Sequence, residues 1–172
     1  SAYEWEREAL DFVRERFPSQ PAYRAWSNFE FIDHDGSINE VDLLVFSPRG
    51  AFLVEIKSWP ERTVGDSATW RREFKDKRRP KVLDNPLLLA NRKAKRLKGL
   101  LDSEFRKLHG KSKKPPFIAP LIFLSHPGVV LDLDDRGRQG VCLRDPEKGD
   151  ATGGYPGIVG ELTNINERDR RR

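Results

Sequence analysis

The sequence has no methionine and only one cysteine, Cys142, among its 172 residues. A single cysteine excludes an internal disulfide, and no cluster of cysteine and histidine residues suggests structural zinc. We therefore expect a reducing compartment, most simply the cytoplasm. Because Ser1 is not a native start, we also expect the chain to be a fragment of a longer protein.

Long hydrophobic runs are missing as well. No apolar run approaches the ~20 residues of a membrane span, and the N-terminus does not resemble a secretion signal, so we expect no membrane partner. Ten Phe and four Trp nevertheless argue against disorder. The length fits one domain, which we place at residues 1–146. A Gly-rich and basic tail over 147–172 would carry little core and lead to a missing downstream region.

The net charge of +5 is unevenly distributed along the chain. Residues 1–60 hold 6 Lys+Arg and 11 Asp+Glu, whereas residues 61–115 hold 18 and 7. Acidic side chains can hold a metal ion and a basic face can hold a nucleic-acid backbone, so this pattern suits a phosphodiester enzyme. A solvated basic loop and helix face would give the same charge pattern.

Hydrophobic periodicity and turn residues predict a helix, then strands, a second helix and a further strand. The expected helices cover 3–17 and 85–101 with an extension to 108, and the expected strands cover 22–33, 38–46, 51–59 and 117–124. Residues 60–84 are polar and basic, and we expect little regular structure there. A further strand pair is expected from 129–133 and 140–143. This order predicts an α/β domain with a mixed sheet flanked by helices.

The strand around Glu55 carries unusual charges for an apolar segment. Because side chains alternate between the faces of a strand, Glu55 and Lys57 share one face with Leu53, while Val54 and Ile56 share the other. Burying charged groups is costly unless they are paired or bind a metal. A surface ion pair on a half-exposed sheet is the alternative.

The register of the preceding hairpin decides whether a second carboxylate joins Glu55. A four-residue Ser-Pro-Arg-Gly loop pairs Phe46 with Ala51 and places Asp42 opposite Glu55. A three-residue loop with a Gly bulge would instead set Asp42 against Ile56. Two facing carboxylates repel each other, and a divalent cation between them would turn this cost into binding energy.

Two other carboxylates are candidates for the same site. Glu6 falls on the inward stripe of the first helix, although it could simply compensate the helix dipole. Glu40 would lie opposite Lys57 in the four-residue-loop register, although it could form only an ion pair. On the second helix, Asn91 lies on the predicted inward stripe and five basic residues lie on the predicted outer side. These basic residues are Arg92, Lys93, Lys95, Arg96 and Lys98.

Asp42, twelve intervening residues and then Glu55-Ile56-Lys57 resemble the Asp…Glu-x-Lys signature of the PD-(D/E)xK nuclease superfamily. More narrowly, residues 4–125 resemble the NERD (nuclease-related) domain. The matching segments are residues 6–10, 39–42 and 50–57, Trp70, and Asn85-Pro86 at the start of a helix. The family often carries a Gln in that helix, and Asn91 is the nearest polar residue here.

The resemblance implies a restriction-endonuclease-like core and a metal-dependent DNA endonuclease. Asp42, Glu55 and the Ile56 carbonyl would bind Mg²⁺ or Mn²⁺, with Glu6 completing the shell. Lys57 would orient the attacking water, and Asn91 could bind phosphate or fix a carboxylate. Basic residues would follow the DNA backbone without reading its sequence. These are Arg92, Lys95, Arg96, Lys77, Arg78 and Arg79.

The resemblance also bears on partners. NERD domains are typically fused to kinases, helicases or other DNA-processing modules, and segments 6–13 and 85–101 look most like the N-terminal domain of the large kinase of phage growth limitation (BREX-type) defence systems. A Ser/Thr kinase would then follow in the full protein, and a homodimer is left open. A catalytically silent DNA-binding module and a protein-interaction domain with an acidic partner are the competing hypotheses.

Overall fold

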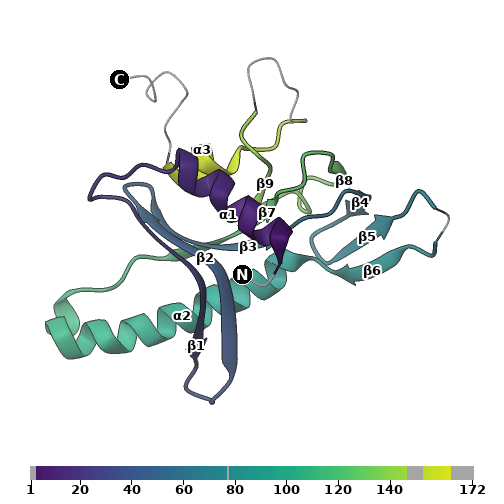
Figure 1. Ribbon diagram of the computed structural model, residues 1–172. Coiled ribbons are helices and arrows are strands. Elements are labelled where there is room, and N and C mark those ends of the chain that lie inside the picture. Colours follow the sequence, from purple (N-terminus) through teal and green to yellow (C-terminus); the bar gives the residue numbers. More distant parts are fainter. Residues whose placement is uncertain (1–2, 77, 147–152, 164–172) are drawn as a thin grey trace.

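A five-stranded mixed sheet forms the centre of the computed structural model, which describes residues 3–76, 78–146 and 153–163. Its strands lie in the order β1-β2-β3-β7-β9 (Figure 1). They are β1 (Arg24–Ile32), β2 (Ile38–Ser47), β3 (Gly50–Lys57), β7 (Ile118–Leu124) and β9 (Val141–Cys142). The β1, β2 and β3 strands are antiparallel, whereas β7 runs parallel to β3 and β9 runs parallel to β7.

Helices cover both faces of this sheet. The α1 helix (Glu4–Arg16) and α3 (Ile158–Thr163) lie on one face, and α2 (Pro86–His109) lies on the other (Figure 1). A short 3-10 turn, η1 (Gly110–Ser112), follows α2. The predicted α/β class, a mixed central sheet flanked by helices as in restriction endonucleases, is confirmed.

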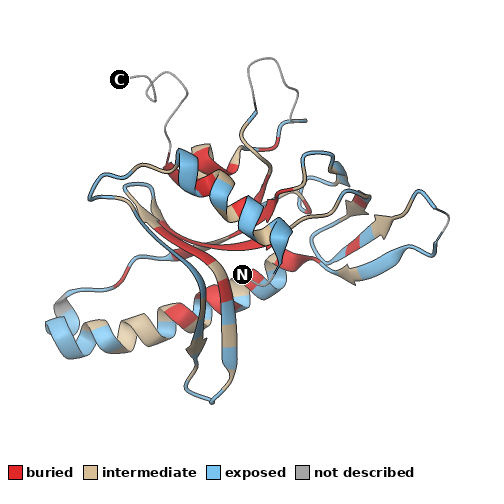
Figure 2. Ribbon diagram, viewed as in Figure 1, coloured by how far each residue is buried: buried red, intermediate tan, exposed pale blue. Residues whose placement is uncertain are grey.

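The β3 strand is buried because helices lie on both of its faces and strands lie on both of its edges. Phe52, Val54 and Ile56 pack in the core cluster that contains α1 and α3. Leu53 packs in the second cluster, which contains α2. Figure 2 shows this buried centre, and the predicted alternation along the strand is confirmed.

The β2–β3 hairpin has the register expected for the four-residue loop, but Ser47 and Gly50 also pair, so only Pro48 and Arg49 lie between the strands. Phe46 pairs with Ala51, as this loop requires, and the paired stretch ends at Leu43 and Val54. The other half of β2 stays with β1 in a hairpin that reaches beyond the rest of the sheet (Figure 1). Counted away from the turn, the last paired residue of β2 is Leu43, and the two strands therefore separate at Asp42.

A second sheet occupies the segment that the sequence patterns left irregular. Its strands lie in the order β6-β5-β4-β8. They are β4 (Arg62–Gly65), β5 (Thr69–Glu73), β6 (Lys81–Asp84) and β8 (Val130–Leu133). The expectation of little regular structure over 60–84 is therefore wrong. Trp70 anchors this sheet, because its side chain is fully buried in the core on the α2 side. Its ring lies edge-on to that of Trp59, with 6.2 Å between the ring centres.

The predicted pairing of 129–133 with 140–143 is also wrong. The β8 strand runs parallel to β4 in the second sheet, and β9 runs parallel to β7 in the central sheet. Both segments are strands, but local sequence gives no information about partners that lie far away in the chain. These two strands tie the C-terminal part of the described chain to both sheets.

The segment after residue 152 contributes to the core. Ile158, Val159 and Leu162 of α3 are fully buried against α1 and the central sheet. The expectation that residues 147–172 carry little core is therefore wrong for 153–163, while the domain boundary at 146 stays a prediction. Within the described residues, no helix combines the length and apolar character that crossing a membrane requires.

Candidate active site

Asp42 binds the main chain of β3 where the two strands separate. Its Oδ2 atom accepts a hydrogen bond of 2.7 Å from the Ile56 N–H. The carboxylate thus takes the place that a main-chain carbonyl of β2 would have in a continued ladder, and it satisfies a buried donor. The four-residue-loop register predicted Asp42 opposite Glu55, but the paired stretch ends at Leu43 and Val54, and the Asp42 carboxylate binds the N–H of Ile56.

Glu55 lies between two lysines. It is 5% exposed, and its Oε1 atom lies 2.9 Å from Lys57 Nζ while its Oε2 atom lies 2.9 Å from Lys93 Nζ. Lys57 comes from the same strand and face, as predicted, and Lys93 comes from α2. Both oxygens of the carboxylate therefore accept a charged donor, which offsets the cost of burial.

The two carboxylates differ in their proton affinity. Burial, and then the neighbouring charge of Glu55, raise the pKa of Asp42 from 3.8 to about 6. Burial also acts to raise the pKa of Glu55, but Lys57 and Lys93 together outweigh it and lower that pKa. Glu55 therefore stays ionised near neutral pH, and Asp42 is the group that takes up a proton first.

Lys93 is the site residue that the sequence analysis missed. The sequence predicts it on the outer side of α2, but it is 9% exposed and lies on the buried stripe with Ala90, Ala94 and Leu97. Positions 90, 93, 94 and 97 have the spacing of one helix face, so a lysine within an otherwise small and apolar stripe was the available signal.

The oxygen donors at this site suit a hard divalent cation. Mg²⁺ and Mn²⁺ prefer carboxylate and carbonyl oxygens, which Asp42, Glu55 and Ile56 could provide. Burial and mutual repulsion of the two carboxylates, seen in the raised pKa of Asp42, are the effects that a cation would relieve. Among the described residues, however, no group of three or more Asp, Glu, His or Cys side chains is placed to hold a metal.

The remaining predicted site residues lie outside this pair of carboxylates. Glu6 is half-buried on α1, whose core residues pack on the opposite face of the sheet from α2. Glu40 is exposed and faces Glu30 of β1, so its predicted position opposite Lys57 is wrong. The reason is that β2 has left β3 before this point. Asn91 is half-buried on α2, beside the stripe that holds Lys93.

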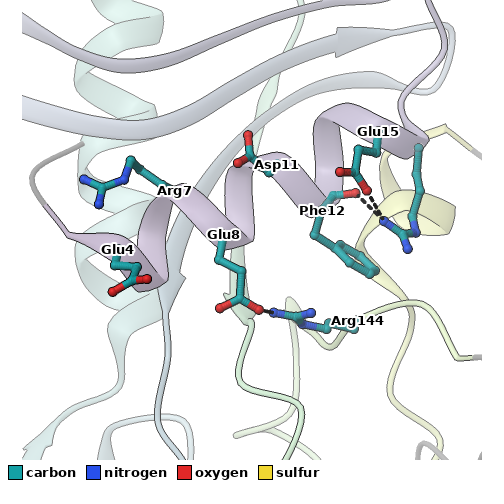
Figure 3. Close-up of a pocket in the computed structure, with 8 residues that line it drawn as sticks. Glu4, Arg7, Glu8, Asp11, Phe12, Glu15 and Arg144 are labelled. Atoms are coloured by element: carbon teal, nitrogen blue, oxygen red, sulfur yellow. Dashed lines mark hydrogen bonds and ion pairs between the residues drawn. The ribbon is translucent and has the colours of Figure 1, made fainter.

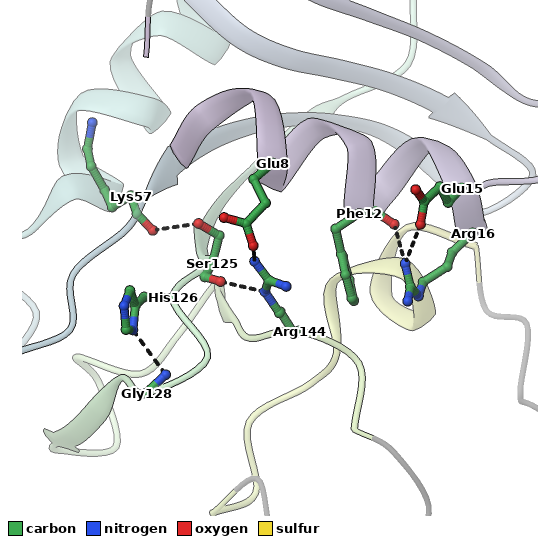
Figure 4. Close-up of polar contacts among 9 residues, drawn as sticks. All are labelled: Glu8, Phe12, Glu15, Arg16, Lys57, Ser125, His126, Gly128 and Arg144. Carbon is green, nitrogen blue, oxygen red and sulfur yellow. Dashed lines mark hydrogen bonds and ion pairs between the residues drawn. The ribbon is translucent and has the colours of Figure 1, made fainter. Parts of the chain in front are cut away.

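The main chain of Lys57 is fixed by the segment that directly follows the neighbouring strand β7 (Figure 4). Its carbonyl accepts a 2.8 Å hydrogen bond from the Ser125 N–H at the end of β7. The Ser125 carbonyl accepts from Arg144 Nε at 2.6 Å, and Arg144 also binds Glu8 of α1 at 2.8 Å. In Figure 4 the Lys57 side chain points away from these contacts. The contact from Ser125 fixes the main chain of β3, while the Lys57 ammonium group pairs with Glu55.

A hollow of about 510 Å³ lies along the outer face of α1 (Figure 3). Four carboxylates line it together with three arginines and Phe12. The carboxylates are Glu4, Glu8, Asp11 and Glu15, and the arginines are Arg7, Arg16 and Arg144. None of the residues predicted for the metal site is among them, so this groove is separate from the Asp42–Glu55 pair.

The basic residues predicted to contact DNA have different surroundings. Arg92 and Lys95 are exposed on α2. Arg96 is half-buried and pairs with Asp33 at 3.5 Å and Asp35 at 3.6 Å in the β1–β2 turn, so it joins the helix to the hairpin. Arg92 and Lys95 are therefore free to contact solvent, whereas Arg96 joins α2 to the β1–β2 turn.

The predicted basic run before β6 lies beside the second sheet. Arg78 and Arg79 are exposed, and the Arg78 guanidinium lies 4.5 Å from the ring centre of Phe74 while also pairing with Asp76. Lys77 lies outside the described residues. A further basic hollow of about 470 Å³, absent from the prediction, lies near the end of α2. It is lined by Lys98, Asp102, Arg106, Lys111, Lys113 and Lys114.

Comparison with known proteins identifies relatives of this chain. The profile of the family described as NERD, nuclease-related domain, matches residues 1–125. The probable kinase PglW of Streptomyces coelicolor is 44% identical over 101 residues, which are 59% of this chain and 6% of that protein. The chain thus spans a small part of this much longer relative. No solved structure matches the chain significantly.

Proposed function

Since the chain belongs to the nuclease-related domain (NERD) family, we propose that it hydrolyses phosphodiester bonds of DNA with Mg²⁺ or Mn²⁺ as cofactor. One observation carries this proposal: Asp42, Glu55 and Lys57 converge where β2 leaves β3. Beyond Val54 the edge of β3 that faces β2 has no partner strand, and a substrate would approach these side chains from this edge.

Asp42, Glu55 and the Ile56 carbonyl would hold the cation, while the predicted share of Glu6 would need its side chain to reach this group from α1. When bound, the ion polarises the scissile phosphate and lowers the pKa of a water molecule. The Lys57 side chain is 29% exposed and its ammonium group is held by Glu55. This group would orient the attacking water and offset negative charge on the phosphate. Asn91 would contact phosphate or a carboxylate.

Exposed basic side chains would hold the DNA backbone. Arg92 and Lys95 on α2 lie on the helix that also delivers Lys93 to the site. Arg78 and Arg79, exposed before β6, would add contacts from the second sheet. Such contacts with phosphates position the duplex without selecting a sequence.

Lys57→Ala tests the assigned role of the lysine. We expect cleavage of a labelled duplex in Mn²⁺ to fall by at least about 100-fold, the lower range for a positioned catalytic group. DNA affinity, measured by fluorescence anisotropy in EDTA, should stay near that of the wild type. A large loss of affinity would instead make Lys57 a phosphate contact.

A catalytically silent DNA-binding module is the second candidate, and the doubly paired Glu55 favours it. Both carboxylate oxygens already accept from a lysine, so the site is electrostatically satisfied by the chain itself. Salt-dependent DNA binding without cleavage in any divalent cation would select this candidate.

The relative also suggests a wider context. We propose that the domain is joined to a kinase in the full protein, because the matched relative is a much longer probable kinase. We also propose that it serves phage defence, as its resemblance to the phage growth limitation kinase implies. Sequencing the gene beyond this segment would test the fusion directly.

A further inference from the structure

The position of Lys93 distinguishes this site from the Asp, Glu and Lys set that its sequence signature describes. Lys93 reaches Glu55 from the opposite layer of the fold, across the interface between α2 and β3. Its side chain is 11% exposed, compared with 29% for Lys57, and its ammonium group lies 2.9 Å from Glu55 Oε2. Lys93 is thus the more deeply buried of the two partners of this carboxylate.

The four charged groups balance each other. With Asp42 and Glu55 ionised, their two negative charges are matched by Lys57 and Lys93. Without Lys93 the same site would carry a net charge of −1. Because the charge of the ligand set tunes the affinity for divalent cations, one additional ammonium group in direct contact with a ligand weakens metal binding.

We propose that Lys93 is a resident counter-ion of Glu55 that competes with the divalent cation and keeps the metal affinity of the site low. This inference rests on the proposed binding of a cation by Asp42 and Glu55. Lys93 acts through Glu55, since the structure gives its ammonium group this carboxylate as partner. Cation entry therefore requires Glu55 to exchange the Lys93 bond for a bond to the metal.

The test measures Mn²⁺ binding by isothermal titration calorimetry, without DNA and without turnover. Lys93→Gln should bind Mn²⁺ at least about tenfold more tightly than the wild type, because one competing charge is removed. Lys107→Gln is the matched control, since it removes an exposed lysine of the same helix that pairs with Glu104, and its affinity should equal that of the wild type.

Thermal unfolding gives a second readout. Without metal, Lys93→Gln should melt below the wild type, because Glu55 loses one of two charged partners. Saturating Mn²⁺ should raise the melting temperature of this variant more than that of the wild type. If Lys93→Gln does not fold, Lys93→Met keeps the length of the side chain without its charge. Lysine side-chain NMR of the wild type then reports whether Mg²⁺ shifts the Lys93 signal.

Equal or weaker Mn²⁺ binding by Lys93→Gln, or a Lys93 signal that saturating Mg²⁺ leaves unchanged, would overturn the counter-ion role. Asp42→Asn separates this failure from failure of the metal site itself. If Asp42→Asn binds Mn²⁺ as the wild type does, the cation is held elsewhere and both proposals fail. If only Asp42→Asn loses affinity while Lys93→Gln matches the wild type, the metal site stands and the counter-ion role fails.

Discussion

Asp42 couples the proton affinity of the site to the stability of the fold. Its raised pKa means that the folded chain binds this proton more tightly than the unfolded chain. The resulting stability is fully present below pH 3.8 and is lost as the pH rises through about 6. A carboxylate that must be ionised to bind metal thus costs stability in the pH range where it would act.

Asp42→Asn should reveal this cost, because Asn can still accept the Ile56 hydrogen bond but does not titrate. In EDTA, the free energy of unfolding of the variant should rise relative to the wild type as the pH increases from 3.8 to about 6. Urea denaturation at several pH values measures the difference between the two proteins. A difference that is independent of pH would contradict the assigned electrostatics.

At the residue scale, the sequence predicted the site incompletely. Asp42, Glu55 and Lys57 could be found because strand alternation and hairpin register are local properties. Lys93 could not be placed against Glu55, since that contact joins residues 38 positions apart in different layers. Its spacing from Ala90, Ala94 and Leu97 fits the apolar stripe of α2, but a lysine is ordinarily assigned to solvent, and Lys93 was therefore predicted on the outer side.

At the scale of elements, α2 has one buried face and one exposed basic face. Its buried face delivers Lys93, and its start is fixed by Asn85, whose side chain accepts from the Leu87 N–H at 2.9 Å and donates to the Asp66 carbonyl at 3.2 Å. Pro86 follows this cap in the first turn. The cap therefore links the placement of α2 to the loop of the second sheet.

The exposed face of α2 should contribute to DNA binding. Replacing Arg92 and Lys95 together with Gln should weaken duplex binding and reduce the slope of log affinity against log salt by roughly 2, because each lost phosphate contact contributes about 0.9. Fluorescence anisotropy over a salt series measures both quantities.

Arg14 and Arg16 provide the matched control, since they are exposed on α1 at the other side of the sheet. Their double replacement with Gln removes the same charge and should leave the salt slope unchanged. Equal effects of the two pairs would mean that net charge, and not the α2 face, determines binding.

The two sheets differ in how well sequence could predict them. The β2, β3 and β7 strands have seven to ten residues with strong apolar patterns, so local rules suffice. Three of the four strands of the second sheet have four residues and one has five, and its one fully buried large side chain is Trp70. Pairing with distant β8 stabilises this sheet, and such pairing leaves no local signal.

At the scale of the whole molecule, residues 153–163 complete the core. A chain that ends at Pro146 would lose the burial of Ile158, Val159 and Leu162. At about 1.5–3 kcal/mol for each buried aliphatic side chain, the loss is on the order of 5 kcal/mol, a large part of the stability of a typical domain. We expect this shorter chain to unfold at much lower urea concentration than residues 1–172.

The replacement Leu162→Ala tests the same contact without changing chain length. It should cost about 2–5 kcal/mol, as for other buried leucines. If the chain ending at Pro146 were as stable as the longer chain, α3 would not belong to the folding unit, and the predicted boundary at 146 would stand.

The most direct test of the proposed nuclease is cleavage of supercoiled plasmid by the wild-type chain in Mg²⁺, Mn²⁺ or EDTA, beside Asp42→Asn. We expect conversion of supercoiled plasmid to nicked and linear forms in at least one divalent cation, none in EDTA, and none with Asp42→Asn. Cleavage by Asp42→Asn at the wild-type rate, or no cleavage by the wild type in either cation despite DNA binding, would contradict the account.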